Sequence, residues 1–366
     1  MAESLSQSTT NSGKSCPKSS VKRLWYQEIA LDYDRGREIY DSLPDAEKIP
    51  VKSHWNIPEL HGNEELASSP MKAKRENLVL GVRGSMKMRA NGRSTDYIAP
   101  GHSNGCDGGC SYCYVYRRKG YANPITVFAN ITQITNYIKN HSNRIGPKDK
   151  PNQCDPVYWT YDLGENSDCS NDARYSNNVA DLITAFKDMP NAKASFATKF
   201  VNRDLLVLDP QQKTRIRFSL MPEHISRIVD VGTSKISDRI AAINDFVEAG
   251  YEVHVNFSPV IIYHGWINDW TELFRQLDAE LSPAAKAQIK SEVIFLTHNE
   301  QLHELNMKWH PKGEELLWTP EWQERKESLN GQANLRYKWQ GKAQMIDIFK
   351  QLSAKEIPYC GIRYIF

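Results

Sequence analysis

The amino-acid sequence predicts an α/β protein whose main domain is a partial barrel of the (β/α)6, TIM-barrel type. Two observations carry this prediction. Short apolar, β-branched segments alternate with amphipathic helical segments from residue 97 onward, as expected for βαβ units and a mostly parallel sheet. About six such units follow one another without any sign of closure, so the sheet should curl into only part of a barrel.

The alternation can be followed along the chain. The carboxyl ends of parallel strands meet at one edge of the sheet, where folds of this kind place their chemistry. We therefore expect the functional residues on the loops that follow the strands. Strands are expected over residues 77–82, 125–129, 157–163, 194–199, 214–220, 253–262 and 290–296, and helices over 131–140, 179–189, 236–249 and 266–281.

The composition is that of an ordinary globular protein. The 366 residues carry a net charge of +2, with 40% hydrophobic and 25% charged residues. A surface that binds nucleic acid would therefore need local segregation of charge. No run of about 18 apolar residues occurs, so no membrane span is expected. The chain shows no export signal, which predicts a cytoplasmic protein.

Four segments are expected along the chain. Residues 1–20 are rich in Ser, Thr and Asn and predict a disordered tail. Residues 21–95 form an N-terminal extension, 96–305 the partial barrel, and 306–366 a C-terminal extension. Within the N-terminal extension, residues 71–93 hold seven Lys or Arg against one acid, Glu76. This basic segment is a candidate nucleic-acid contact or a solvated surface.

Three of the seven cysteines crowd into the run GCDGGCSYCY, from Gly105 to Tyr114. Thiolates at Cys106, Cys110 and Cys113 can wrap a loop around a soft metal centre. Three cysteines on a [4Fe–4S] cluster leave one iron open for an external ligand such as S-adenosylmethionine (SAM). The glycines between them allow the loop to curl closely around such a cluster.

A structural zinc site is the alternative interpretation of the same run. His102 lies four residues before Cys106, so one histidine and three cysteines could complete a tetrahedral zinc site. Zinc knuckles more often use two Cys-x2-Cys pairs or distant histidine pairs, which are absent. The spacing and the position of the loop before a series of βα units favour the iron–sulfur interpretation.

Beyond the cysteine run, the sequence resembles the spore photoproduct lyase family of radical SAM enzymes, from about residue 23 to residue 366. The cysteine run marks only the radical SAM superfamily, whereas an ordered set of further segments is more specific. These segments are ALDY (30–33), LVLGVR (78–83), DYIAP (96–100), ATKF (197–200), RIRFS (215–219), DRIAA (238–242), AGY (249–251), HGW (264–266) and RYKW (336–339).

The resemblance implies a chemistry. In this family, reductive cleavage of SAM yields a 5′-deoxyadenosyl radical, which removes a hydrogen atom from a thymine–thymine photoproduct in DNA. The bridge between the two thymines then breaks, and a cysteine returns a hydrogen atom. The resemblance further implies damaged DNA as substrate, an electron donor such as flavodoxin or ferredoxin, and a monomeric enzyme.

The resemblance also assigns roles. Cys106, Cys110 and Cys113 match the cluster ligands, and Tyr112 and Tyr114 match the relay tyrosines, with Tyr112 also facing the cofactor. Lys199 and Ser219 match positions that contact SAM. Without the resemblance, both would be interpreted as ordinary polar residues at strand ends.

In the family, the hydrogen-donor cysteine lies in a Glu-x-x-Cys-Thr-Ser-Asp segment. The most similar segment of this sequence is ENSDCSND, residues 165–172. Cys169 keeps the spacing to Asp172 but lies one residue further from Glu165. It is therefore either the donor or a small buried residue. No role is assigned to Cys16, Cys154 or Cys360.

Two basic stretches are candidate DNA contacts beside the basic segment. Arg117, Arg118 and Lys119 follow the cysteine loop directly, and Arg336, Tyr337 and Lys338 match a family hairpin that enters the lesion site. Alternating cations and aromatic rings suit phosphate contact and base stacking. A solvated basic face, or an edge strand with a polar face, is the structural alternative in each case.

The sequence also departs from the family. The residues between the cysteine ligands differ, and the tryptophan-rich stretch 309–322 has no counterpart that we can align. Two alternative functions therefore stay open: a radical SAM enzyme acting on another substrate, and a zinc-stabilised nucleic-acid-binding protein without catalysis.

Overall fold

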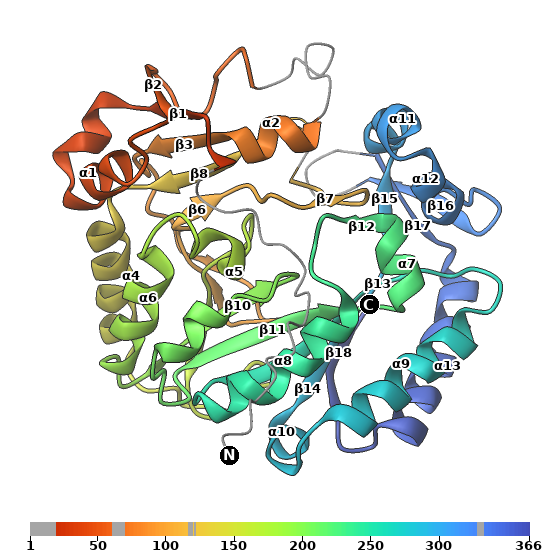
Figure 1. Cartoon of the computed structure of the whole chain (residues 1–366). Coiled ribbons are helices and arrows are strands. Elements are labelled where there is room, and N and C mark those ends of the chain that lie inside the picture. The colour runs from red at the N-terminus through yellow and green to blue at the C-terminus, as the bar shows by residue number, and fades with distance from the viewer. Residues whose placement is uncertain (1–19, 61–69, 116–119, 121, 328–332) are drawn as a thin grey trace, which may run out of the picture.

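The protein is described by a computed structural model, in which residues 20–60, 70–115, 120, 122–327 and 333–366 are placed. Its largest element is an eight-stranded sheet in the order β18-β14-β13-β11-β10-β9-β5-β4 (Figure 1). All neighbours from β18 to β5 are parallel, and only β4 is antiparallel. Its strands are β4 (Arg89–Ala90), β5 (Tyr97–Ile98), β9 (Trp159–Asp162), β10 (Ala192–Thr198), β11 (Thr214–Leu220), β13 (Glu252–Val260), β14 (Lys290–Phe295) and β18 (Gly361–Ile365).

Helices cover the outer face of this sheet and form the main core with it. Helix α4 buries Ile131, Ile134 and Ile138, and the spacing of three and four residues places these side chains on one face. The sheet curves as a half-barrel, and the expected α/β fold with mostly parallel strands is confirmed. The covering helices are α4 (Ile131–Ile145), α6 (Asn178–Lys187), α8 (Ile236–Glu248), α9 (Trp266–Glu280), α10 (Pro283–Gln288) and α13 (Trp339–Glu356).

A smaller five-stranded sheet lies beside the half-barrel, in the order β2-β1-β3-β8-β6. Strand β8 was expected as a barrel strand, but it pairs in parallel with β3 of the N-terminal extension. Pairing between strands therefore crosses the boundary expected at residues 95/96. The strands are β1 (Arg23–Tyr26), β2 (Glu47–Pro50), β3 (Asn77–Gly81), β6 (Ser103–Asn104) and β8 (Ile125–Phe128), with helix α1 (Asp34–Asp41) packed against them.

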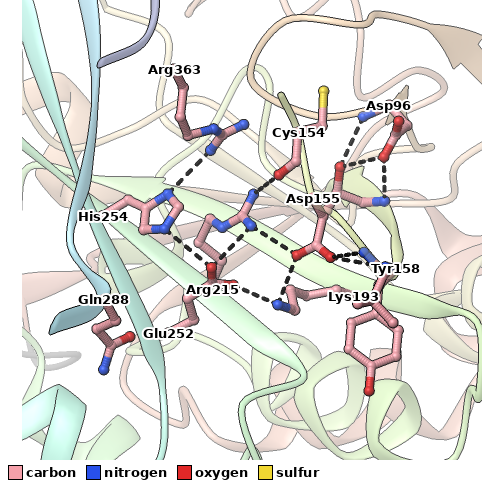
Figure 2. A network of polar contacts seen from close by, with 12 residues as sticks. Asp96, Cys154, Asp155, Tyr158, Lys193, Arg215, Glu252, His254, Gln288 and Arg363 are labelled. Carbon is pink, nitrogen blue, oxygen red and sulfur yellow. Dashed lines mark hydrogen bonds and ion pairs between the residues drawn. The ribbon is translucent and has the colours of Figure 1, made fainter. Parts of the chain in front are cut away.

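Charged side chains fill the amino-terminal end of the half-barrel (Figure 2). Arg215 lies 3.1 Å from both Asp155 and Glu252, and Lys193 binds the same two carboxylates. Arg363 of edge strand β18 donates hydrogen bonds to the carbonyl oxygens of Gln153 and Ser94, near the opposite edge of the sheet. Side-chain hydrogen bonds thus connect the two edges of the curved sheet, which strand pairing does not close into a full barrel.

His254 makes this network sensitive to acid. Burial, helped by the Arg215 charge, lowers the pKa of His254 to about 3. Below pH 6.5 this histidine is protonated in the unfolded chain but stays neutral in the native protein, so the free energy of unfolding decreases as pH falls toward 3. We expect the wild type to lose roughly 2–3 kcal/mol more than His254→Gln between pH 6 and pH 4. Urea unfolding at both pH values measures this, and equal losses would contradict it.

A C-terminal lobe lies beyond the sheet and contacts the cysteine loop, where Asn306 donates to the Ser111 carbonyl and Leu302 packs against Cys113. A three-stranded sheet of β15 (Thr297–Asn299), β17 (Ala333–Tyr337) and β16 (Gln323–Glu327) packs there with helices α11 (Glu300–Trp309) and α12 (Pro311–Leu317). In the described part of the chain, no helix has the length and apolar character needed to cross a membrane. The predicted tail, residues 1–20, falls outside the described residues except for Ser20.

Candidate active site

The cysteine loop lies at the carboxyl ends of the parallel strands, as expected. The Gly105 amide donates to the carbonyl of Asn166, which follows β9. Strand β7 (Gly109–Cys110) pairs antiparallel with β12 (Asp230–Val231), which follows helix α7 (Glu223–Val229). Contacts from different parts of the chain therefore hold the loop before any ligand arrives, which lowers the cost of binding one.

The loop backbone bends where its glycines allow it. Gly105 has a φ of +93°, and a Cβ at this position would lie 2.5 Å from the carbonyl oxygen of Pro124. The Gly108 amide lies 3.3 Å from the Cys106 sulfur, as suits a thiolate ligand. The buried ammonium of Lys74, on helix α2 (Pro70–Glu76), donates to the Gly108 carbonyl at 2.6 Å. A cation therefore lies under the thiol loop, where anionic ligands would gather.

Of the three loop cysteines, Cys110 is buried, and Cys106 and Cys113 are half-buried. Three thiolates can hold an iron–sulfur cluster with one open iron, whereas a structural zinc site needs a fourth ligand. Burial raises the pKa of Cys106 and Cys110, so bound iron would have to stabilise the thiolates.

His102 does not complete a zinc site with the cysteines. The ring is fully buried, with Nδ1 2.9 Å from the Leu163 carbonyl oxygen and Nε2 3.1 Å from Asp172. Both nitrogens therefore lie beside groups other than the cysteines, although Nε2 makes no hydrogen bond to Asp172. This placement removes the fourth ligand on which the zinc alternative depended.

A buried polar network joins the loop to strand β10. The Tyr112 hydroxyl donates to Asp230, and Lys199 donates to the Tyr112 oxygen. Lys199 lies 3.0 Å from Asp230, and Arg239 lies 3.4 Å from the same carboxylate. Although burial opposes ionisation, Lys199 and Arg239 hold the pKa of Asp230 below its usual value. Tyr112 and Lys199, both predicted, are thus brought together.

Asp230 and Arg239 are site residues that the sequence analysis missed. Arg239 also donates to the carbonyl of Ser219, at 2.7 Å, which places Ser219 in the same network. Asp230 lies 118 residues from Tyr112 along the chain, and nothing in its local sequence distinguishes it from a surface aspartate. A signal did exist for Arg239, because it lies in the DRIAA segment of the family resemblance.

Tyr114 lies on the outer side of the loop and is 49% exposed. Its hydroxyl donates to the carbonyl oxygen of Glu165, and the Glu165 side chain pairs with Arg89. Tyr112 and Tyr114 therefore face different partners on either side of Cys113. The residue that the structure places against Tyr114 is a glutamate.

Cys169 is buried in the core and not presented at the loop. It begins helix α5 (Cys169–Asp172), is 1% exposed, and belongs to the main hydrophobic cluster. Burial raises the pKa of the Cys169 thiol well above its usual value, and after burial its proximity is the second cause that raises the pKa of Tyr251, so it lies near that ring. Tyr251 packs against Phe246 of α8. The structure thus favours the small buried residue over the hydrogen donor.

A second alignment of the donor segment agrees with this placement. The family segment Glu-x-x-Cys-Thr-Ser-Asp can also be aligned with residues 162–168 without a gap. Its first acid then matches Asp162, its serine Ser167 and its last aspartate Asp168. The cysteine position then falls on Glu165, which touches Tyr114. Asp168 caps helix α5 and accepts from the Lys199 amide, and burial raises its pKa to about 6.

We expect Cys169→Ala to leave the reaction products unchanged. The thiol is buried away from the loop, so its loss should cost about 1 kcal/mol of stability and no chemistry. The measurement is chromatography of the products formed from a photoproduct dinucleotide, beside denaturant unfolding. New adducts in place of thymine, with SAM still cleaved, would restore Cys169 as the donor.

The predicted DNA contacts divide three ways. Arg117, Arg118 and Lys119 fall outside the described residues. Arg336 pairs with Glu324 across β16 and β17, and Lys338 donates to the Glu321 carbonyl from an exposed position. The prediction that Tyr337 contacts DNA does not agree with its position in the structure. It is 1% exposed, packs against Phe295 and accepts from the Ile262 amide, so its ring is not available to stack on a base.

Among α/β half-barrels, a loop of three thiols at this edge of the sheet marks the radical SAM enzymes, and we assign the protein to that class. The chain belongs, more narrowly, to the spore photoproduct lyase family, whose model matches residues 21–366. It is 27% identical over 278 residues to spore photoproduct lyase of Bacillus subtilis (strain 168), covering 75% of this chain and 78% of that protein. The lyase of Geobacillus sp. (strain Y412MC61) is 25% identical over 276 residues, covering 75% and 77%.

Solved structures share the fold. One is a spore photoproduct lyase complexed with dinucleoside spore photoproduct, and another is a variant with bound AdoMet and the same dinucleoside. Each superposes with a TM-score of 0.84 at 23% identity, covering 94% of this chain and 99% of the other. The fold described above therefore follows the architecture of those enzymes over most of its length. The boundary expected at residues 305/306 does not separate two parts of it, because α13 and β18 belong to the half-barrel and β15 to the C-terminal lobe.

Proposed function

We propose that this protein is a radical SAM carbon–carbon lyase that repairs the spore photoproduct, 5-thyminyl-5,6-dihydrothymine, in ultraviolet-damaged DNA. The observation that carries the proposal is the tethered loop of Cys106, Cys110 and Cys113 at the carboxyl ends of the strands, in a chain that matches the family from residue 21 to residue 366. The main sheet would then correspond to the six-unit partial barrel of this class.

The three cysteines would hold a [4Fe–4S] cluster and leave one iron open for SAM. When bound and reduced, the cluster and SAM supply the 5′-deoxyadenosyl radical that begins the repair. The chain supplies positions and charges for the rest. Lys199 and Ser219 stand at the ends of β10 and β11, where an ammonium and a hydroxyl suit the polar methionine part of SAM. Tyr112, held by Asp230, fixes one wall of that region.

The exposed face of the C-terminal lobe would contact DNA. Arg336 and Lys338 supply cations for phosphates. Trp322 and Trp339, which are 42% and 72% exposed, supply rings for stacking in place of the buried Tyr337. Both tryptophans lie beside the hairpin in sequence. In this proposal, the tryptophans replace Tyr337 as the stacking residues, and Arg336 and Lys338 remain the phosphate contacts.

Three further features of the proposal concern the cellular setting. The reaction needs an external one-electron donor, such as a flavodoxin or a ferredoxin. We further propose that the enzyme acts as a monomer. The free thiols of Cys154, Cys169 and Cys360 suit a reducing cytoplasm.

The test is made anaerobically. The cluster is reconstituted and reduced, SAM is added with an oligonucleotide that contains the photoproduct, and restored thymine is followed by chromatography. Restored thymine supports the proposal. If SAM is cleaved to 5′-deoxyadenosine while the lesion is untouched, the chain is a radical SAM enzyme of another substrate.

One observation favours that second candidate. Among the described cysteines outside the loop, Cys154 and Cys169 are 1% exposed and Cys360 is 3% exposed. None offers a thiol at the surface of the site. An enzyme of this fold without an accessible thiol must return the hydrogen atom by another route, or act on a substrate that needs none.

A further inference from the structure

The C-terminal lobe gathers two histidines and a carboxylate in its interior. His298 of β15 places Nε2 3.0 Å from both oxygens of Glu314 on α12. His303 of α11 places Nδ1 2.5 Å from one of them. All three ligand atoms lie within 4.8 Å of one another. The lobe residues come from three separate elements, so the fold and not local sequence brings them together.

The chemistry of this set points to a transition-metal ion. Two imidazole nitrogens and one carboxylate oxygen are a donor set of zinc and iron(II) sites, and calcium or magnesium would take oxygen ligands throughout. Metal–ligand bonds of about 2.0–2.2 Å in tetrahedral geometry place donor atoms roughly 3.3–3.6 Å apart, so the present hydrogen bonds of 3.0 and 2.5 Å would open by about 0.5–1 Å to admit an ion. The His298 and Glu314 side chains are 0% and 4% exposed and that of His303 is 24% exposed, so solvent reaches the set from one side.

Neighbouring side chains orient the set. The Asn306 amide donates to Glu314 and also, at 2.6 Å, to the carbonyl oxygen of Ser111. The ring of Trp318 stacks on His303 at 3.9 Å between centroids. Ser111 lies between Cys110 and Tyr112, so Asn306 connects the set directly to the back of the cysteine loop. Such outer contacts hold metal ligands in place.

We propose that His298, His303 and Glu314 bind a divalent transition-metal ion, zinc in the first instance, in a structural site separate from the three-cysteine loop. The ion locks β15, α11 and α12 together and fixes Asn306 against Ser111. It takes no part in the chemistry of the loop. The proposal stands whether or not the protein repairs DNA, because it rests on the lobe alone.

The test counts zinc and iron separately in the full-length protein. After anaerobic cluster reconstitution, dialysis against zinc and removal of loose metal, the wild type should hold one zinc per chain beside its iron. Glu314→Gln and His303→Ala should lose the zinc and keep the iron. His224→Ala is the matched control, because His224 also faces a carboxylate, Asp269, but on the surface; it should keep both metals.

A second background separates the two sites. In the variant with Cys106, Cys110 and Cys113 all changed to alanine, one cobalt(II) per chain should still bind, without a thiolate charge-transfer band. A zinc-dependent rise in melting temperature should occur in the wild type and not in Glu314→Gln. The proposal is overturned if the wild type holds no zinc and zinc leaves its melting temperature unchanged, which would identify the set as a hydrogen-bonded network only. The proposal is also overturned if the triple cysteine variant loses the zinc while Glu314→Gln keeps it, because the zinc would then be bound by the cysteine loop.

Discussion

Replacing Cys110 with alanine is expected to abolish iron binding and reduce SAM cleavage to background. Cys110 is 7% exposed and lies in the β7–β12 pairing, opposite Asp230. Two thiolates cannot hold the cluster, and the described cysteines outside the loop are all buried at other places in the fold. Iron content per chain, visible absorbance under anaerobic conditions and 5′-deoxyadenosine formation measure the effect.

The control for this change is Cys360→Ala. Cys360 is also buried, at 3% exposure, but it directly precedes the parallel strand β18 and therefore lies at the amino-terminal end of the sheet, whereas the loop lies at the carboxyl ends. Its variant should keep full iron and SAM cleavage and lose only some stability. A Cys110→Ala protein with wild-type iron and cleavage would show that another residue holds the cluster, and the assignment of the loop would be lost.

The second large effect is expected from Asp230→Ala. The change removes the carboxylate that the fully buried Arg239 and the 20% exposed Lys199 share. Removing one partner of a buried ion pair costs about 3–5 kcal/mol, because the remaining charge stays buried. Tyr112 loses its acceptor at the same time, so SAM cleavage should fall about 10- to 100-fold. Denaturant unfolding and 5′-deoxyadenosine formation report the two effects.

Two further variants show whether charge or shape matters at this position. Asp230→Asn keeps an acceptor for Tyr112 but removes the charge, so it should retain the Tyr112 contact and lose part of the stability. Asp245→Asn is the matched control, because Asp245 pairs with Arg203 at the surface, where ion pairs contribute about 0–1 kcal/mol. Equal stability of Asp230→Ala and wild type would contradict the buried network described here.

The places of Cys169 and Glu165 bear on how a hydrogen atom could be returned. The Cys169 thiol is buried, whereas the Tyr114 hydroxyl bonds to the backbone carbonyl of Glu165, whose carboxylate pairs with Arg89. A carboxylate cannot donate a hydrogen atom to a carbon radical as readily as a thiol can. The product analysis of Cys169→Ala therefore bears on which step of the reaction this chain performs differently from its relatives.

Much of the architecture could be predicted from local sequence. The β-branched run at residues 253–262 became strand β13, and the isoleucines of 131–140 became the buried face of α4. These features depend on side-chain periodicity over a few residues. The position of the cysteine loop followed from strand direction, because the carboxyl ends of parallel strands share one edge.

The sequence by itself determined the α/β class, the three thiols and the resemblance to one family, because each is a property of neighbouring residues or of their order. Only the tertiary structure decided which of the predicted residues meet. It paired Tyr112 with Asp230 across 118 residues and engaged His102 away from the thiols. Tyr337 and Cys169 became core residues, because burial depends on what packs against a side chain and not on its type. The set of His298, His303 and Glu314 arises for the same reason, since three elements must fold together before their ligand atoms converge.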